Sequence, residues 1–466
     1  MRIIPKNTKV KLQFYKGIGI YDVILAIVAL AFIALIVTSN LPSKYIIAMI
    51  VLIVVAPMYI PIGDIKLYQA LGYAVKFGVA KKSFYKNKNG NSHISTIIPY
   101  ASINDNCITQ KDGTFTGVIE IKPIEFNMLS ENKQNFLIDG IISNTLKNVG
   151  IFQEYDLIKL EKPIIFDNYL KNELNRIQKL IAENENKNLT EDEFRKRVEI
   201  IEDRMNLIDS LNTNEKIYAS AYFVALHDIS KQSLENSLEI IEQTLNNGSL
   251  EAKRLNDKEI AIFLKYSYDK EFDEREFDNF KKSEYLQNIY PESVQFKTLS
   301  TKQNGKILTH FVITDFPLKV DNAWGQQLFD IPNTKVVMKC KPVEKYKAIK
   351  RIDNAINEIL SQNTLGKASS QIDRQTHLES LQILLEGLQN DNEVFFDTTL
   401  MITSYDSDKN VENKKFVRRK LRELGFKFSE MFGRQIESYF SSNINNYNKT
   451  NISRGFNSSI IASCFP

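Results

Sequence analysis

The stretch NCITQKDGTFTGVIEI, residues 106–121, contains two strand-like runs separated by a turn signal. The runs cover residues 106–110 and 114–121, and Asp112-Gly113 lies between them. An Asp-Gly pair in this setting is a strong signal for a two-residue hairpin turn, because glycine readily adopts the positive φ that such turns need. We therefore predict a β-hairpin over residues 101–121 and, with it, an antiparallel sheet.

Helix-like and strand-like patterns alternate beyond this hairpin. A second hairpin is predicted between residues 294–299 and 306–313, turning at Asn304-Gly305. Gly248 is predicted to cap a helix over 231–245. Further strands are predicted at 217–226, 250–255, 334–341, 394–404 and 426–431, and further helices from 130, around 260–264, and at 343–360, 369–388 and 411–424. This order predicts an α+β fold of mostly antiparallel sheets, faced on one side by helices and built from ferredoxin-like units.

Residues 168–212 have a different composition, with apolar residues at helical spacing among many charged residues. Thr190-Glu191-Asp192-Glu193 matches a capping box, which restarts a helix after a break. The segment is therefore predicted to form an antiparallel helical hairpin that projects from the body. Two interpretations remain open, a solvated structural arm and an arm that binds a partner.

Two apolar runs, residues 23–38 and 45–62, indicate a membrane hairpin. Each approaches the ~20 residues that cross a hydrocarbon core, Asp22 is tolerable near the interface, and Pro57 and Pro61 predict a break at the far end of the second run. A cleaved signal peptide is the alternative for the first run, but a second run follows it and no small-residue cleavage site is found. Residues 67–77 are amphipathic and are predicted to lie along the inner interface.

Basic residues set the predicted orientation of this hairpin. They flank both ends of it, whereas its connector, residues 39–44, holds only Lys44. Basic flanks stay in the cytoplasm, so we predict a two-pass protein of the inner (cytoplasmic) membrane with both termini cytoplasmic. The flanking basic residues are Arg2, Lys6, Lys9, Lys11 and Lys16 before the hairpin and Lys66, Lys76, Lys81, Lys82, Lys86 and Lys88 after it.

These patterns divide the chain into five predicted regions. Residues 1–82 form the membrane hairpin and interfacial segment, and residues 83–95 form a linker. Residues 96–345 form a first α+β region that carries the helical arm, and residues 346–442 form a second, helix-rich α+β region. Residues 443–466 are predicted to be a linker towards a further domain.

Composition and motifs argue against most site chemistries. The 466 residues carry a formal charge of +4, which does not indicate a nucleic-acid-binding surface. The three cysteines and four histidines are scattered along the sequence and have no metal-ligand spacing. The near-matches to a phosphate-binding loop at Asn304-Gly305-Lys306 and Leu365-Gly366-Lys367 lack the required residues. The basic cluster 414–422 has the pattern of an ordinary amphipathic helix. We therefore predict no catalytic, cofactor-binding or metal-binding residues, no cofactor and no ATP hydrolysis by this chain.

Several stretches resemble the N-terminal, non-motor region of the conjugation-type ATPases that energise type IV secretion systems. The hairpin at residues 23–62 is similar to the small inner-membrane subunit of such systems, which is sometimes fused ahead of the ATPase. One departure is Ala323 before Trp324, where the family often has glycine. The stretches that carry the resemblance are 112–121 with Asn127 and Leu129-Ser130, 307–324, 331–334, Lys341-Pro342, Ile372 with 377–380, 392–396 and 457–466.

The resemblance implies a membrane-anchored, non-catalytic scaffold that holds an ATPase motor against the inner-membrane complex. Its implied partners are the membrane, secretion-channel subunits, the motor domain or subunit, and further copies of the chain in a homo-oligomer, with no direct nucleic-acid contact. Two alternatives stay open. The chain is part of a complete ATP-hydrolysing enzyme whose motor follows Pro466, or it is a free-standing membrane scaffold.

Overall fold

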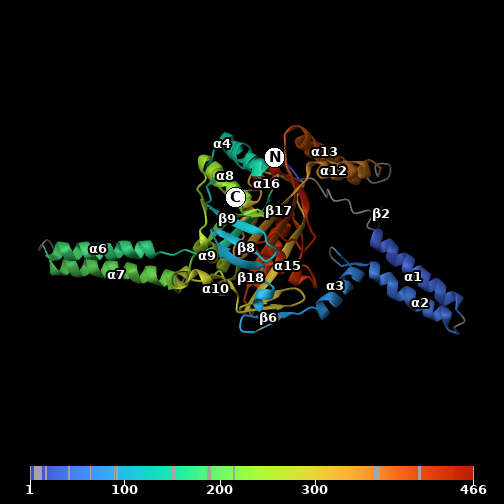
Figure 1. The fold of residues 1–466 in the computed structure, drawn as a ribbon, viewed down its shortest axis with the longest axis horizontal. Helices are drawn as coiled ribbons and strands as arrows, with labels where there is room; N and C mark the ends of the chain where they lie inside the picture. Colours follow the sequence, from blue (N-terminus) through green and yellow to red (C-terminus); the bar gives the residue numbers. More distant parts are fainter. Residues whose placement is uncertain are drawn as a thin grey trace.

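The computed structural model describes residues 2–4, 13–15, 18–39, 42–62, 65–88, 90, 93–149, 153–185, 190–213, 216–361, 368–407 and 411–464. Residues 83–464 form a body built on one large sheet (Figure 1). The strands of this sheet are β6 (Ser83–Tyr85), β7 (Tyr100–Asn104), β8 (Cys107–Gln110), β9 (Phe115–Ile121), β10 (Glu154–Pro163), β11 (Tyr218–Asp228), β12 (Ala252–Arg254), β13 (Ser293–Phe296), β14 (Thr301–Gln303), β15 (Lys306–Asp315), β17 (Thr334–Val343), β18 (Phe395–Asp406), β19 (Lys427–Ser429) and β20 (Arg454–Asn457).

The helices of the body lie between and after these strands. They are α4 (Glu131–Asn135), the π-helical segment η5 (Phe136–Ser143), α5 (Asn144–Val149), α6 (Asp167–Glu185), α7 (Glu191–Thr213), α8 (Lys231–Asn247), α9 (Asp257–Tyr268), α10 (Tyr285–Ile289), α11 (Gln326–Phe329), α12 (Lys345–Ser361), α13 (Ala368–Asn390), α14 (Glu412–Glu423), α15 (Gln435–Ser442) and α16 (Ser458–Ala462). Short 3₁₀ turns are η3 (Ile94–Thr96), η4 (Phe126–Met128), η6 (Glu274–Asn279) and η7 (Lys282–Glu284).

The sheet runs in the order β6-β13-β14-β15-β18-β17-β10-β11-β9-β8-β7, with β12, β19 and β20 paired to β9, β15 and β18. Its named strands pair antiparallel throughout the described part of the chain. The predicted α+β class with an antiparallel sheet is therefore confirmed.

Two βαββαβ units lie side by side in this sheet. The first is β9, α4 to α5, β10, β11, α8 and β12 along the chain, with the sheet order β12-β9-β11-β10. The second is β15, α11, β17, β18, α14 and β19, with the sheet order β19-β15-β18-β17. Both have the strand order of a ferredoxin-like unit. Each also has a helical hairpin inserted between its second and third strands, α6–α7 in the first and α12–α13 in the second.

The second strands of the two units, β10 and β17, pair antiparallel and join the units into one sheet. We call this strand pair the seam. Because equivalent strands meet antiparallel, the units are related by an approximate two-fold axis through the seam. The predicted boundary at 345/346 therefore does not divide the sheet, since β18 lies between β15 and β17.

Two predicted linkers are wrong because their residues belong to the body. Residues 83–95 contribute β6, which pairs with β13, and Ile94, which is fully buried. Residues 443–466 were expected to lead away from the fold. Instead, Ile444 is buried, β20 pairs with β18, and α16 packs into the core.

Both faces of the sheet are buried, which corrects the expectation of helices on one side only. Alternate residues of one strand point to opposite faces, so on β10 Leu157 enters one apolar core and Ile158 another. The first core is covered by helices of the two units, including α8 and α14. The second core is covered by α9, α10 and α15, and it also takes side chains from the edge strands β6 and β7, so the sheet curls around it.

The helical hairpin predicted at 168–212 is present as α6 and α7, and it projects from one side of the body (Figure 1). One half of the predicted capping box is present, because the Glu193 carboxylate accepts from the backbone N–H of Thr190, and it accepts from the Thr190 hydroxyl as well. The α12–α13 hairpin projects from another side. Its helices close a small apolar core of their own around Leu381 and Leu384.

The predicted hairpin that turns at Asp112-Gly113 is confirmed, since β8 and β9 pair antiparallel across it, whereas the second predicted hairpin has a different strand pairing. Residues 100–121 form three strands, with one turn at Asp105-Asn106, where both residues have positive φ, and one around Asp112-Gly113. The Asn304-Gly305 turn is present, but it joins β14 to β15, and the strand predicted at 294–299 is β13, which pairs with β14. Insertion of the short strand β14 explains this difference, and in the first case β7 adds a third strand ahead of the confirmed hairpin.

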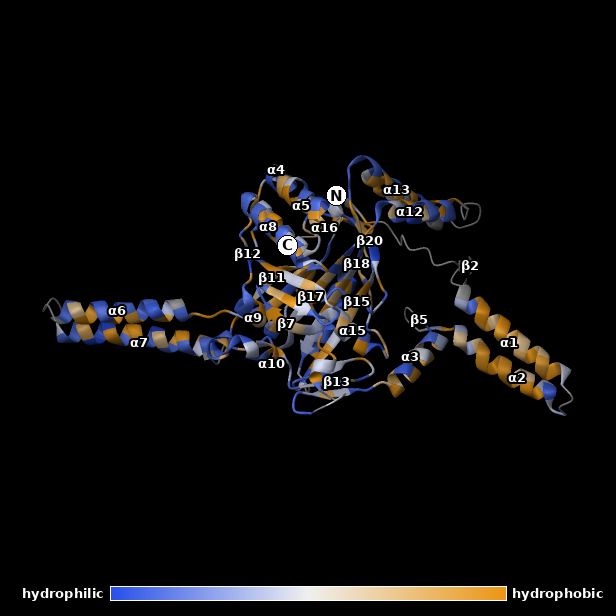
Figure 2. Cartoon of the chain, in the orientation of Figure 1, coloured by the Kyte–Doolittle hydropathy of each residue, from blue (hydrophilic) through white to orange (hydrophobic). Residues whose placement is uncertain are grey.

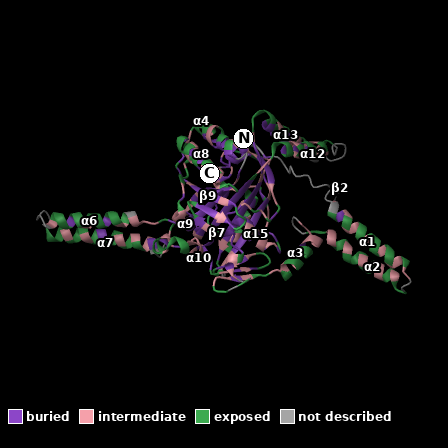
Figure 3. Cartoon of the chain, viewed as in Figure 1, coloured by how far each residue is buried: buried purple, intermediate pink, exposed green. Residues whose placement is uncertain are grey.

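The apolar N-terminal segment forms the helices α1 (Ile20–Thr38) and α2 (Lys44–Val55), which lie side by side, followed by the 3₁₀ turn η1 (Ala56–Tyr59) at the predicted proline break. Figure 2 shows both helices as almost wholly hydrophobic, and Figure 3 shows them largely exposed. Within the described residues, one helix, α1, is long and apolar enough to span a membrane, and Lys44–Tyr59 is a shorter apolar helix. The small strands near it are β2 (Gln13–Tyr15), β3 (Ile18–Gly19), β4 (Pro61–Ile62) and β5 (Ile65–Lys66).

Residues 2–4 return to the body ahead of this segment. The strand β1 (Arg2–Ile3) pairs with β16 (Lys319–Val320), and Ile4 is 1% exposed in the first core. The Ile4 N–H donates to the Leu318 carbonyl at 2.8 Å. After the hairpin, α3 (Leu67–Val79) leads directly into β6.

Candidate functional site

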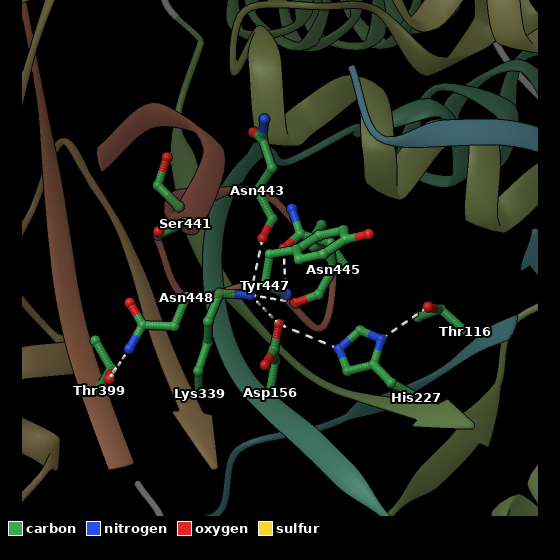
Figure 4. A network of polar contacts seen from close by, with 12 residues as sticks. Thr116, Asp156, His227, Lys339, Thr399, Ser441, Asn443, Asn445, Tyr447 and Asn448 are labelled. Atoms are coloured by element: carbon green, nitrogen blue, oxygen red, sulfur yellow. Dashed lines mark hydrogen bonds and ion pairs between the residues drawn. The ribbon is translucent and has the colours of Figure 1, made fainter. Parts of the chain in front are cut away.

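A group of buried charges lies at the seam between the two units. Asp156 on β10 and Lys339 on β17 are directly opposite each other, with Lys339 Nζ 2.9 Å from Asp156 Oδ2. His227 on β11 brings Nε2 to 3.3 Å from the same carboxylate oxygen. Strand alternation places all three side chains on the face of the second core, where they meet (Figure 4).

The Lys339 ammonium is satisfied by three acceptors, although it is buried. Besides Asp156, it donates to the Asn443 carbonyl at 3.1 Å and to the Asn445 carbonyl. An ammonium has three donors, and removing a charge from water costs several kcal/mol unless such partners replace the water. We call residues 443–453 the strap, because its carbonyls close over Lys339 beside the seam.

Burial on its own would raise the pKa of the Asp156 carboxyl. The positive charge of Lys339 and the contact with His227 outweigh burial, so the pKa of Asp156 lies below its ordinary value. Asp156 is therefore an anion at neutral pH, and the seam holds a carboxylate and an ammonium in direct contact.

Thr116, His227 and Asp156 have the order of a hydroxyl–imidazole–carboxylate triad. The Thr116 hydroxyl is 2.7 Å from His227 Nδ1. However, Thr116 is 0% exposed, and its Oγ1 also accepts a hydrogen bond from Gln110 Nε2 at 2.9 Å. A nucleophile must reach its substrate, so the geometry is that of a buried structural network and not of a catalytic one.

The same network fixes the strap at further points. Gln110 Nε2 donates to the Ile444 carbonyl at 3.1 Å, and Asn448 Nδ2 donates to Thr399 Oγ1 at 2.7 Å. A pocket of about 390 Å³ lies between the strap and the ends of β10, β17 and β18. Its charged lining residues are of both signs, Glu154, Asp156 and Asp397 against Lys339 and Lys341.

The strap continues directly from α15, and α15 touches α3, the helix that follows the apolar hairpin. Lys76 of α3 forms an ion pair of 2.7 Å with Glu437 of α15, and the Arg434 guanidinium lies 4.8 Å from the centre of the Tyr73 ring. Gly433 has a positive φ, and a Cβ there would lie 3.1 Å from the Tyr73 carbonyl oxygen. A continuous series of contacts therefore connects α3 through α15 and the strap to the seam.

A second polar group closes the base of the apolar hairpin. Asp22, near the start of α1, is buried and lies 2.6 Å from Lys66 Nζ, beyond the end of α2. The Asp22 carboxylate also accepts from the Gly19 N–H at 2.6 Å, and the Tyr59 hydroxyl donates to the Asp22 carbonyl at 3.0 Å. These contacts hold the two ends of the hairpin together.

The stretches that the sequence singled out do not converge on a site. The Gly366-Lys367 near-match falls in residues 362–367, outside the described residues, and so do Phe465 and Pro466. In α14 the apolar Val417 and Leu421 are buried, as predicted, and Arg418 is paired with Glu430. Among the described residues, no group of three or more His, Cys, Asp or Glu side chains is placed to hold a metal ion.

Sequence reasoning missed the seam network, although the sequence carries a signal for it. Asp156 and Lys339 stand within runs that are mostly apolar and read as buried strands, YDLIKL and VVMKCK. Charged residues are almost never fully buried unless they are paired. Two such strands that carry opposite charges predict a cross-strand ion pair.

Comparison of the sequence with protein-family models gives no match, and comparison with curated proteins gives none either. The fold and contacts define the class of protein by themselves. It is an α+β protein with two ferredoxin-like units in one sheet, preceded by an apolar helical segment of which α1 can span a membrane.

Proposed function

We propose that this chain is a membrane-anchored scaffold whose α1–α2 hairpin crosses the membrane twice. The body then lies on the side where the hairpin begins and ends. The observation that carries this proposal is the position of residues 2–4, which pair with β16 and bury Ile4 in the first core. Residues before α1 and residues after α2 both belong to the body, so the chain must cross an even number of times.

The length of the second helix is compatible with this topology. Lys44–Tyr59 spans sixteen residues, or about 24 Å at ~1.5 Å per residue. That is shorter than the ~30 Å hydrocarbon core, and local thinning or long interfacial side chains accommodate such a mismatch. Lys44 and Tyr45 at one end and Tyr59 at the other are residues that anchor helices at interfaces.

Charge supports a cytoplasmic body. The basic residues flank the hairpin on the body side, and the connector carries Lys44 alone. Retention of basic flanks in the cytoplasm then places both ends of the hairpin, and the body, in the cytoplasm. The protein is therefore a two-pass inner-membrane protein in this proposal.

The partners proposed for the scaffold are those of a type IV secretion ATPase, that is, inner-membrane channel subunits and an ATPase motor. The resemblance of residues 112–121, 307–324 and 392–396 to that family supports this assignment. The two helical hairpins, α6–α7 and α12–α13, provide elongated surfaces outside the sheet for such partners (Figure 1).

Cysteine labelling of intact cells tests the topology. A membrane-impermeant maleimide is expected to label Ser43→Cys in the connector, and to label Ile229→Cys, 81% exposed on the body, only after lysis. The three native cysteines are buried and serve as an internal background. Labelling of Ile229→Cys in intact cells would overturn the orientation, and protection of Ser43→Cys would overturn the second crossing.

Co-purification tests the scaffold assignment. The detergent-solubilised chain, cross-linked in its own membrane, is expected to recover secretion-channel or motor subunits. The same preparation with α6–α7 removed is expected to recover fewer of them. Recovery of the chain alone in both preparations would contradict a secretion scaffold and favour a free-standing one.

A further inference from the structure

We infer that α3 is a membrane-surface helix that inserts one apolar face among anionic lipid headgroups and clamps the body to the bilayer with the other. This inference rests on the proposed membrane anchoring and goes beyond it. It names a second contact with the bilayer, the chemistry of the lipid, and the element through which the body meets the membrane.

The two faces of α3 have different partners. Leu71, Val75 and Val79 recur every four residues and are therefore on one side of the helix; they are 47%, 69% and 87% exposed. Tyr73 and Phe77 are on the opposite side, where Tyr73 contacts Arg434 and Phe77 packs against the second core. One face is thus occupied by the body, and the other is an exposed apolar stripe.

Charge identifies the occupant of the exposed face. Residues 65–104 contain six lysines and no aspartate or glutamate. Lys81 and Lys82 follow the apolar stripe directly and are exposed. An amphipathic helix with an apolar stripe and adjacent lysines binds the headgroup region of anionic membranes.

The position of α3 agrees with this occupant. Helix α3 follows the hairpin base, where Lys66 meets Asp22, so its start is fixed at the level at which α1 and α2 leave the bilayer. Figure 2 shows α3 lying across the direction of α1 and α2, as a helix in the interface plane would lie beside a helical hairpin that crosses the membrane. The N-terminal end of α3 therefore lies beside the base of the apolar hairpin.

The contact with α15 gives this arrangement a mechanical role. The Lys76–Glu437 ion pair and the stacking of Arg434 on Tyr73 attach the body to the back of α3. A helix held by lipid on one face and by α15 on the other fixes the height and tilt of the sheet above the membrane. The strap follows α15 in the chain, and its carbonyls contact Lys339 at the seam.

Depth-dependent quenching in nanodiscs tests the inference with the full chain. Single-cysteine variants Leu30→Cys in α1, Val75→Cys in α3 and Ile229→Cys on the body are labelled with a small fluorophore. They are placed in phosphatidylcholine nanodiscs with or without about 30% phosphatidylglycerol, with brominated acyl chains as the quencher. Because an interfacial helix buries its apolar face ~5–10 Å deep, we expect Val75 to be quenched at least about twofold more than Ile229.

The control variants separate the possible failures. Quenching at Leu30 but not at Val75 would overturn the α3 inference and leave the membrane anchor standing. Absence of quenching at Leu30 would overturn both. Lys81→Gln/Lys82→Gln is expected to abolish the extra quenching at Val75 that phosphatidylglycerol causes, without changing Leu30. Equal quenching in both lipids would overturn the preference for anionic lipid.

Discussion

Ser249, and not Gly248, has the left-handed conformation that ends α8. Ser249 has φ +64°, whereas Gly248 has φ −78°, and the Leu250 N–H donates to the Leu245 carbonyl. This bond is the 6→1 bond of a Schellman motif, in which the left-handed residue is usually glycine. Gly248 is required for a different reason, since a Cβ there would lie 2.8 Å from Ile141 Cγ2.

Ser249→Gly is therefore expected to stabilise the protein. The left-handed conformation costs a non-glycine residue ~1–2 kcal/mol, and glycine avoids this cost. Glycine also gives the unfolded chain more conformational freedom, which offsets part of the benefit, so we expect the free energy of unfolding to rise by about 0.5–1 kcal/mol. Urea unfolding of the detergent-solubilised chain measures it. The matched variant Gly248→Ala is expected to lower stability, and a gain there with no gain at Ser249 would contradict this assignment.

Lys335 on β17 is buried on the second-core face, and burial lowers its pKa to about 7, with the nearby Lys339 charge adding to the effect. Its Nζ donates to the Ser267 carbonyl at 3.3 Å, and the Tyr405 hydroxyl reaches the same carbonyl. Burial, together with the charge of Lys335, lowers the pKa of neighbouring His310 to about 3. We therefore expect the stability of the second core to depend on pH.

The sign of that dependence follows from proton linkage. The unfolded lysine keeps its ordinary pKa near ~10.4, so between pH 7 and that value the unfolded chain binds more protons and stability rises with pH. Lys335→Met is expected to add about 2–4 kcal/mol at pH 6.5 and much less at pH 9.5. Urea midpoints at the two pH values measure this, with the exposed Lys345→Met as control. A wild-type urea midpoint that does not rise from pH 6.5 to pH 9.5 would contradict the lowered pKa of Lys335.

The seam ion pair gives a third prediction at this scale. Asp156→Ala leaves the Lys339 ammonium buried without its counter-charge and is expected to cost about 3–5 kcal/mol. The double variant Asp156→Leu/Lys339→Met removes both charges and is expected to be clearly more stable than Asp156→Ala. A double-mutant cycle by urea unfolding measures the coupling, and additive single effects would argue against a direct pair.

At the scale of elements, the helical hairpins are insertions between paired strands. Pro163, before α6, is the pairing partner of Tyr218, after α7, so the ends of the arm are already adjacent. Val343 and Phe395 bracket α12–α13 in the same way. The body therefore does not need either hairpin to bring its strands together.

Replacement of residues 167–213 by a short Gly-Ser turn is expected to leave the thermal midpoint of the body within a few degrees of the wild type. The corresponding deletion of α12–α13 is expected to cost more, because Phe395 belongs to the apolar core that these helices close. Differential scanning fluorimetry of both variants checks the order. Loss of folding on removal of the α6–α7 arm would show that it is integral to the sheet.

Elements with strong local signals could be predicted, and those fixed by distant pairing could not. The Thr190 capping box and the apolar spacing of α6–α7 are local, so that hairpin was predicted correctly. The three-residue strand β14 has no pattern of its own and exists because β13 and β15 lie on either side of it. The strap was predicted as a linker because its burial depends on Lys339 and Gln110, far away in the sequence.

At the scale of the whole molecule, the chain ahead of α1 is attached to the body through Ile4. Ile4→Asp would place a charge in the first core, and β1 is expected to detach from β16. Trypsin is then expected to cleave faster within the basic segment of residues 6–16. Mass spectrometry of the early fragments measures the change, with Arg2→Gln as control. Unchanged protection would show that β1 does not depend on Ile4.

The α+β class and the ferredoxin-like units followed from the alternation of helices and strands, but the joining of two units into one sheet did not. The β10–β17 pairing connects residues that are far apart in the chain, and each strand taken alone shows no preference for the other. The seam charges were missed for the same reason, since Asp156 acquires its partner only when β17 is in place.

That pairing also imposes an order of events on a growing chain. The first unit is complete once β12 has been synthesised. The outer edge of its strand β10 has no pairing partner until β17, which ends at Val343, has been synthesised as well. At translation rates of ~5–20 residues per second, the backbone groups of that edge remain without a partner for on the order of ten seconds. An unpaired strand margin invites pairing with other chains. Nascent molecules side by side on one messenger are therefore most prone to misassemble during this interval, before the second unit emerges.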